Sequence, residues 1–95
     1  MATFALICLD KPGSVDLRLA SREAHLAYVQ AHRNLVRLAG PFLDEEGRMI
    51  GSLFLIEAPD EAAARAFHAA DPYVLAGLFE RSDLRRWRAT VGDLP

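Results

Sequence analysis

The sequence predicts an α+β domain in which two helices pack on a four-stranded antiparallel sheet, with elements ordered β-α-β-β-α-β. Residues 3–9 and 49–57 are apolar on both alternating faces, which is typical of inner strands. The alanine-rich residues 61–70 favour a helix, and the short polar, glycine-containing loop 44–48 favours a hairpin. This order is the split βαβ, or ferredoxin-like, arrangement.

The first half should contain a strand, a helix and a second strand. The strand of residues 3–9 ends at a polar segment that contains proline and glycine. Ser21 is expected to cap the first helix, which then runs to about Arg33. Asn34 tolerates left-handed backbone angles and marks the passage to an alternating strand at residues 35–43.

The second half should begin with the strand of residues 49–57. Asp60 is expected to cap the helix of residues 61–70, and a short helical turn follows Asp71. A last strand covers roughly residues 82–90. It carries the only basic cluster of the chain, whose charges either protect a sheet edge or contact anions.

The length of 95 residues predicts a single domain spanning 1–95. A composition of 52% apolar and 25% charged residues is typical of an ordered globular protein. The net charge of −2 provides no broad positive field, and the inner strands lack the aromatic pattern with which such folds bind RNA. Nucleic acid is therefore not expected as a partner.

Cys8 is the only cysteine, so an internal disulfide and a thiolate zinc cluster are both excluded, which favours a reducing cytoplasm. The apolar N-terminal run lacks a basic leader and is too short for a membrane span, so no membrane partner is expected. Two helices cover only one face of the sheet, whereas the inner strands are apolar on both. We therefore predict a homodimer in which two sheets pack face to face.

His25 and Asp71 are the leading candidates for chemistry, because a histidine paired with a carboxylate moves protons near neutral pH. Each also has a structural alternative. His25 would then be a half-buried packing residue, and Asp71, which precedes a proline, would be a helix N-cap. The two roles of Asp71 are compatible, since one carboxylate oxygen can accept a backbone N–H while the other accepts from His25.

Arg22, Tyr73 and Ser52 are candidate substrate-binding residues. Arg22 lies one helical turn before His25 and could bind a substrate carboxylate, although arginines in a first turn are commonly solvated. Tyr73 could donate a hydrogen bond to an oxyanion, or simply pack. Ser52 is expected to face the cavity, but no base is spaced from it as in a catalytic triad.

No metal site is predicted. His32 follows His25 by seven residues, which places the two about 10 Å apart along a helix, too far to share one ion. His68 precedes Asp71 by one turn and is expected at an exposed helix position. A site built from His25, His68 and Asp71 matches no known ligand spacing.

Several short segments carry a family resemblance: Arg-x-x-His-Leu at 22–26, Ala-Gly-Pro at 39–41, Gly-Ser-Leu-Phe-Leu-Ile-Glu at 51–57, Asp-Pro-Tyr at 71–73 and Ala-Gly-Leu-Phe-Glu at 76–80. Through them the chain resembles the YciI-like family, from its first strand to Trp87. The Asp-Pro-Tyr element and its spacing to the Gly-Ser strand are the most specific features. The linker 32–34 lacks the glycine that family members often have there, which affects a pocket wall more than the His/Asp pair.

The resemblance implies a ferredoxin-like α+β fold, assembly as a dimeric α+β barrel, and an active site built from His25 and Asp71. It also implies cofactor-independent proton transfer on small metabolites, including elimination. We therefore expect a cytoplasmic homodimeric enzyme that uses neither cofactor nor metal and catalyses elimination, isomerisation or hydrolysis of an anionic or carbonyl-bearing small molecule. The alternatives are a non-catalytic ligand-binding module and a cofactor-free monooxygenase.

Overall fold

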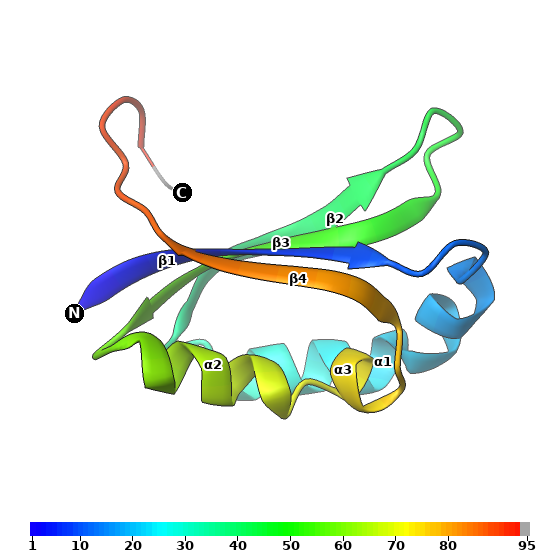
Figure 1. The fold of residues 1–95 in the computed structure, drawn as a ribbon, viewed down its shortest axis with the longest axis horizontal. Coiled ribbons are helices and arrows are strands. Elements are labelled where there is room, and N and C mark those ends of the chain that lie inside the picture. Colours follow the sequence, from blue (N-terminus) through cyan, green and yellow to red (C-terminus); the bar gives the residue numbers. More distant parts are fainter. Residues whose placement is uncertain (94–95) are drawn as a thin grey trace.

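The computed structural model describes residues 1–93 and has the predicted order of elements (Figure 1). These are β1 (Ala2–Asp10), α1 (Val15–Ala31), β2 (Val36–Leu43), β3 (Met49–Ala58), α2 (Glu61–Ala69), α3 (Pro72–Leu75) and β4 (Phe79–Arg86). The short helix α3 is the helical turn expected after Asp71. The predicted ferredoxin-like α+β fold is therefore confirmed.

The four strands form one antiparallel sheet in the order β2-β3-β1-β4. β1 lies inside the sheet, where Phe4 pairs with Ile56 on one side and with Arg86 on the other. β2 and β3 are joined by the expected hairpin, in which Asp44 accepts the backbone N–H groups of Glu46 and Arg48. A register shift interrupts the pairing of β2 with β3 close to its start.

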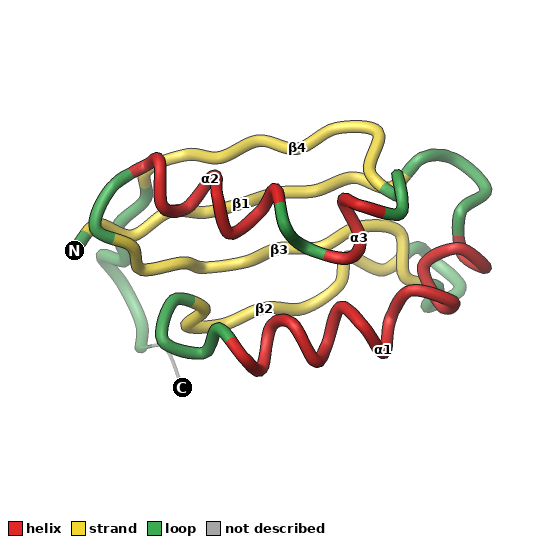
Figure 2. The backbone as a smooth tube through the Cα atoms, turned by 90° about the horizontal axis from the view of Figure 1, so that it is seen from below, coloured by secondary structure: helices red, strands yellow, loops and turns green. Residues whose placement is uncertain are grey.

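All three helices lie on the same face of the sheet (Figure 1). Seen from that side, α1 follows the β2 edge, while α2 and α3 follow one another across the other strands (Figure 2). The core between the layers is built from alternate residues of the strands and one face of each longer helix. Its buried members are Phe4, Leu6, Cys8, Val29, Val36, Phe54, Ile56, Ala58, Ala64 and Phe67.

The first helix begins earlier than the sequence predicted. Its N-cap position is Ser14 rather than Ser21, and the Ser14 side chain makes no capping hydrogen bond. The early turns are instead held against the sheet, because Arg18 forms a buried ion pair with Asp10 at the end of β1. As a result His25 lies in the middle of α1 and not in its first turn.

The other boundary errors have local causes. α1 ends at Ala31, and the chain turns through backbone bonds to the carbonyl of His32, so Asn34 is not needed in a left-handed conformation. Within residues 1–93 only glycines have positive φ. β4 ends at Arg86 rather than near residue 90, because its partner β1 has almost reached its own start there.

On the face of the sheet opposite the helices, β1 and β3 are largely apolar, as the two-sided pattern of the inner strands predicted, whereas β4 presents the charged residues Arg81, Asp83 and Arg85 there. Register places Ala5, Ile7 and Leu9 of β1 on this face, beside Leu53 and Leu55 of β3. Leu9 and Leu53 are substantially exposed, and no helix covers this face in the described part of the chain (Figure 1). No helix among residues 1–93 has the length and hydropathy needed to cross a membrane.

Gly51 is required by a close approach of two strands. A Cβ added at Gly51 would lie 2.6 Å from the carbonyl oxygen of Cys8, which is fixed in the sheet. Gly51→Ala should therefore lower the free energy of unfolding by about 1–3 kcal/mol in urea titrations. Gly40→Ala is the control, because an added Cβ there meets nothing within 4 Å. Equal free energies of unfolding for the two variants would contradict this prediction, because they would show that β1 and β3 can move apart at Gly51 without loss of stability.

Candidate active site

The structure brings His25 and Asp71 together although they are far apart in the sequence. His25 is presented by α1 and Asp71 immediately precedes α3, and Nδ1 of the imidazole lies 2.8 Å from Oδ1 of the carboxylate. His25 is 7% exposed and Asp71 is 0% exposed. A carboxylate oxygen in such a contact accepts, so Nδ1 carries the hydrogen and Nε2 is the nitrogen left for a ligand.

Asp71 also caps α3, so the contact with His25 and the helix cap are both present. The oxygen that accepts from His25 is Oδ1, and the same atom accepts the backbone N–H of Tyr73 at 2.9 Å. The sequence predicts that the two bonds fall on different oxygens, whereas they share one. Pro72 at the first helical position fixes the backbone of the turn that directs the Tyr73 N–H to this oxygen.

Two aromatic rings hold the imidazole in place. The His25 ring stacks on Tyr73 with centroids 3.9 Å apart and an interplanar angle of 14°. It meets Phe54 edge-on at 5.8 Å. With one nitrogen bonded to Asp71, the ring has little freedom to rotate, so the direction of Nε2 is set before any ligand binds.

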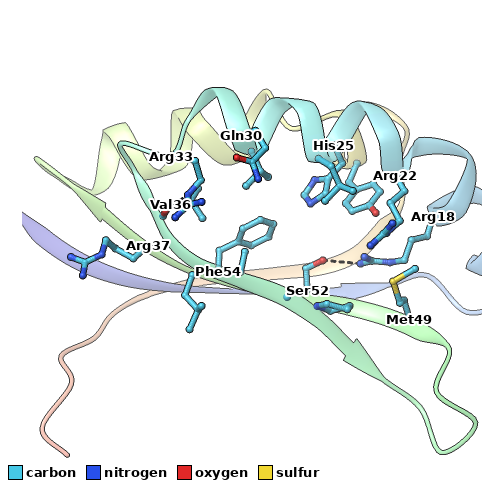
Figure 3. Close-up of a pocket in the computed structure, with 17 residues that line it drawn as sticks. Arg18, Arg22, His25, Gln30, Arg33, Val36, Arg37, Met49, Ser52 and Phe54 are labelled. Atoms are coloured by element: carbon cyan, nitrogen blue, oxygen red, sulfur yellow. Dashed lines mark hydrogen bonds between the residues drawn. The ribbon is translucent and has the colours of Figure 1, made fainter. Parts of the chain in front are cut away.

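Arg18 belongs to the site and was not identified from the sequence. It is 2% exposed. Its guanidinium donates twice to Asp10, at 2.7 and 2.9 Å, and once to the Ser52 hydroxyl at 2.8 Å (Figure 3). The guanidinium carbon also lies 4.6 Å from the centre of the Tyr73 ring. Burial acts to lower the pKa of Arg18, but the hydrogen bonds from Arg18 to Asp10 and the negative charge of Asp10 outweigh burial, so the pKa of Arg18 is raised.

His25 lines a cavity of about 320 Å³ between α1 and the β2 side of the sheet, and Asp71 lies buried behind it. All three predicted substrate-binding residues, Arg22, Ser52 and Tyr73, line it together with His25 and Arg18. Its volume falls within the range of small-molecule sites. Figure 3 shows Arg18, Arg22 and His25 gathered at one end.

Tyr73 is buried, and its phenol is kept protonated. Burial raises its pKa, while the charges of Arg18 and Arg22 act in the opposite direction without cancelling this effect. A protonated phenol is a hydrogen-bond donor. Tyr73 therefore combines packing against His25 with a neutral donor group beside it.

His68 is half-buried, which corrects the expectation of an exposed position. Its ring stacks against Phe79 at 6.0 Å, and Nδ1 is buried without a hydrogen-bond partner within residues 1–93. The second oxygen of Asp71, Oδ2, is likewise buried without a hydrogen-bond partner within residues 1–93. Burial lowers the pKa of His68 below its ordinary value of 6.5, with Asp71 opposing this shift and Arg65 adding to it.

The remaining polar candidates lie outside the pair. Nδ1 of His32 donates to the carbonyl of Tyr28, and the ring packs edge-on against Phe67. Burial raises the pKa of Cys8 to about 12, so its thiol is not a nucleophile at neutral pH. Among residues 1–93 no three His, Cys, Asp or Glu side chains are grouped as metal ligands would be.

Comparison with known proteins identifies relatives over nearly the whole chain. The model of the YCII-related domain matches residues 2–88. Protein YciI of Escherichia coli is 32% identical over 93 residues, covering 90% of this chain and 95% of that protein. An uncharacterized protein of Haemophilus influenzae is 32% identical over 84 residues, covering 80% and 86% of the two chains.

Solved structures share the fold. The 5-chloro-2-hydroxyhydroquinone dehydrochlorinase TftG of Burkholderia phenoliruptrix, in complex with 2,5-dihydroxybenzoquinone, is 30% identical with a TM-score of 0.86, covering 93% of this chain and 95% of that one. An antibiotic biosynthesis monooxygenase is 17% identical with a TM-score of 0.55, covering 96% and 100% of the two chains. At that identity the second likeness concerns the fold alone.

The buried ion pair between Arg18 and Asp10 generates a stability prediction. Arg18→Met leaves the Asp10 carboxylate buried without its partner, which should cost about 3–5 kcal/mol in urea titrations. Arg18→Met combined with Asp10→Leu should recover much of this loss, because neither charge remains. The matched control is Arg48→Met, which breaks the exposed pair with Asp44 and should have a far smaller effect. A loss as small as that of the control would refute the structural role.

The lowered pKa of His68 generates a pH prediction. The unfolded chain takes up a proton near pH 6.5 more readily than the folded one, so the free energy of unfolding should decrease as the pH falls through that value. In His68→Phe, which keeps an aromatic ring against Phe79, this part of the slope should disappear. Urea titrations of both proteins between about pH 5 and 8 measure the difference. Parallel pH curves would contradict the assignment.

Proposed function

The chain belongs to the YCII-related domain family, and on that premise we propose that it is a small-molecule enzyme in which His25 and Asp71 transfer a proton. The supporting observation is the buried 2.8 Å contact between His25 Nδ1 and Asp71 Oδ1 at the wall of a ligand-sized cavity. The mechanism requires no cofactor or metal.

In the proposed reaction Nε2 of His25 is the general base. It accepts a proton from the substrate, and the imidazolium that forms is stabilised by the adjacent carboxylate of Asp71. Because the Tyr73 and Phe54 rings already hold the imidazole, no rotation precedes the transfer. The same nitrogen then returns the proton as a general acid to a leaving group or to another substrate atom.

Negative charge that develops on the substrate has several partners at the same end of the cavity. The Ser52 hydroxyl accepts from Arg18 and so has its own hydrogen to donate. Tyr73 supplies a neutral phenol donor, and Arg22 supplies a positive charge. Donors fixed in this way stabilise an enolate, phenolate or carboxylate more than solvent water does.

Elimination is the reaction class that the comparisons favour. TftG, a relative by fold and sequence, is a dehydrochlorinase, and a dehydrochlorination removes a proton and a chloride from one molecule. The removal of a proton and a chloride needs a base beside groups that stabilise negative charge, and His25 and the donors described above would supply both. Isomerisation and hydrolysis by proton transfer use the same groups and are open to the same site.

Two other functions remain as alternatives. A non-catalytic ligand-binding module would need the cavity but not the reactivity of His25. A cofactor-free monooxygenase is favoured by the fold shared with antibiotic biosynthesis monooxygenases. Substrate turnover separates the first alternative from an enzyme, and oxygen dependence identifies the second.

The apolar side chains that β1, β2 and β3 present on the open face of the sheet support the proposal of a homodimer. Leu9 is 45% exposed, Leu38 41% and Leu53 36%, and all three lie on the face that the helices leave open. Pairing two such faces around a two-fold axis would bury them with a single self-complementary surface.

The proton-transfer proposal predicts a large loss of rate in two variants. In a metabolite screen that includes 5-chloro-2-hydroxyhydroquinone, His25→Gln and Asp71→Asn should each lower the rate by about a hundredfold or more. Asparagine also caps helices well, so Asp71→Asn keeps the cap while it removes the carboxylate. Asp60→Asn, at the cap of α2, is the matched control and should retain full activity. Full activity in Asp71→Asn would refute the role of the pair.

The dimer proposal predicts the outcome of sedimentation. The natural chain should sediment as a dimer at micromolar concentration, and Leu53→Asp should sediment as a monomer, because a charge would lie in the apolar interface. Leu75→Asp is the control, since Leu75 is 75% exposed on α3 in the helical layer. A monomeric natural chain would exclude the face-to-face assembly.

A further inference from the structure

The charges that line the cavity have one sign and occupy its two ends. None of the residues lining it within 1–93 is acidic. Figure 3 shows Arg18 and Arg22 beside His25 at one end, and Arg33 and Arg37 at the other. A cavity with cationic groups at both ends differs from a general anion site, because it distinguishes ligands by the positions of their charges.

At the His25 end, Arg22 is the cation available to a ligand. The neighbouring Arg18 is neutralised by its buried double contact with Asp10. Arg22 is exposed and lines the cavity without an acidic neighbour in the lining. An anionic group bound to Arg22 would lie beside the imidazole of His25.

At the far end the corresponding cation is Arg33. Its Nε donates to the carbonyl of Val36 at 3.3 Å, which holds the side chain toward the sheet and leaves the outer nitrogens of the guanidinium for a ligand. Arg37 is already paired with Glu57 at 2.5 Å. Within residues 1–93, each end of the cavity therefore has one arginine that forms no ion pair with an acidic side chain.

The wall between the two ends is largely apolar. Its apolar members are Leu26, Val29, Val36 and Phe54, and Gln30 is a polar residue between the two ends (Figure 3). Arg22 and Ala31, the last residue of α1, are separated by about 14 Å along the helix axis at 1.5 Å per residue, and Arg33 follows just beyond. A short dianion could not reach both ends, whereas a longer molecule with an apolar middle would cover this wall.

We propose that the cavity binds an elongated dianion, with one acidic group at Arg22 beside His25, an apolar chain or ring system along the wall, and a second acidic group at Arg33. The inference rests on the proposed function for one point, namely that the reaction takes place at the His25 end. Arg33 thereby selects substrates by their distal charge without contacting the reacting atoms.

Matched pairs of acids test the distal contact by calorimetry on the full chain. Adipate and hexanoate share one chain length and differ in the second carboxylate, as do suberate and octanoate. A charge-assisted hydrogen bond is worth enough for the dicarboxylate of the better-fitting pair to bind about tenfold more tightly. Arg33→Gln should remove this preference and leave the affinity for the monocarboxylate unchanged, whereas Arg22→Gln should weaken both acids.

Two further variants separate the possible failures. Arg48→Gln, in the β2–β3 hairpin outside the cavity, should bind all four acids as the natural chain does. His25→Gln should keep the preference for dicarboxylates, so loss of catalysis in that variant bears on the proposed function and not on the charge selection. Equal affinities within both pairs, a preference that survives in Arg33→Gln, or binding of none of the acids at millimolar concentration would overturn the inference.

Discussion

One oxygen atom, Oδ1 of Asp71, fixes the relation between two helices that the chain forms far apart. It accepts the N–H of Tyr73, which starts α3, and it accepts from the imidazole of His25 in the middle of α1. Because the carboxylate is completely buried, water cannot replace either donor. The position of Nε2 in the cavity therefore depends on α3 being in place.

A second buried group, the Arg18 guanidinium, fixes the same end of the cavity against the sheet. It joins the end of β1 through Asp10, the inner strand β3 through Ser52, and α1, to which it belongs. Its charge is compensated by Asp10, so it contributes directed hydrogen bonds with little net attraction for a ligand. The cavity thus has a rigid polar end next to His25, whereas Arg22 and Arg33 at its margins are solvent-exposed.

The strands and their faces were predictable because alternation and loop composition are local properties of the sequence. The start of α1 was not predictable in this way. Serine is a preferred N-cap residue, which favoured Ser21, whereas the true start depends on the tertiary ion pair of Arg18 with Asp10. If α1 is begun at Val15, then Arg18, Arg22 and His25 fall on one helical face, and that spacing could have identified Arg18. The family resemblance indicated His25 and Asp71. It did not indicate that the two donors share Oδ1 of Asp71, or that His68 is half-buried against Phe79, because both features depend on tertiary packing and not on local sequence.

The cavity wall opposite His25 is made partly by β2, an edge strand whose pairing with β3 is interrupted near Val36. An edge strand has one free side, so insertions, deletions and changes of side-chain size there leave the ladder formed by β3, β1 and β4 intact. His25, Asp71 and Tyr73 all come from the helical layer and do not depend on β2 for their hydrogen bonds. The shape of the cavity can therefore change through β2 while the contact between His25 and Asp71 is kept, which makes this scaffold suited to diversification of the ligands that it can hold.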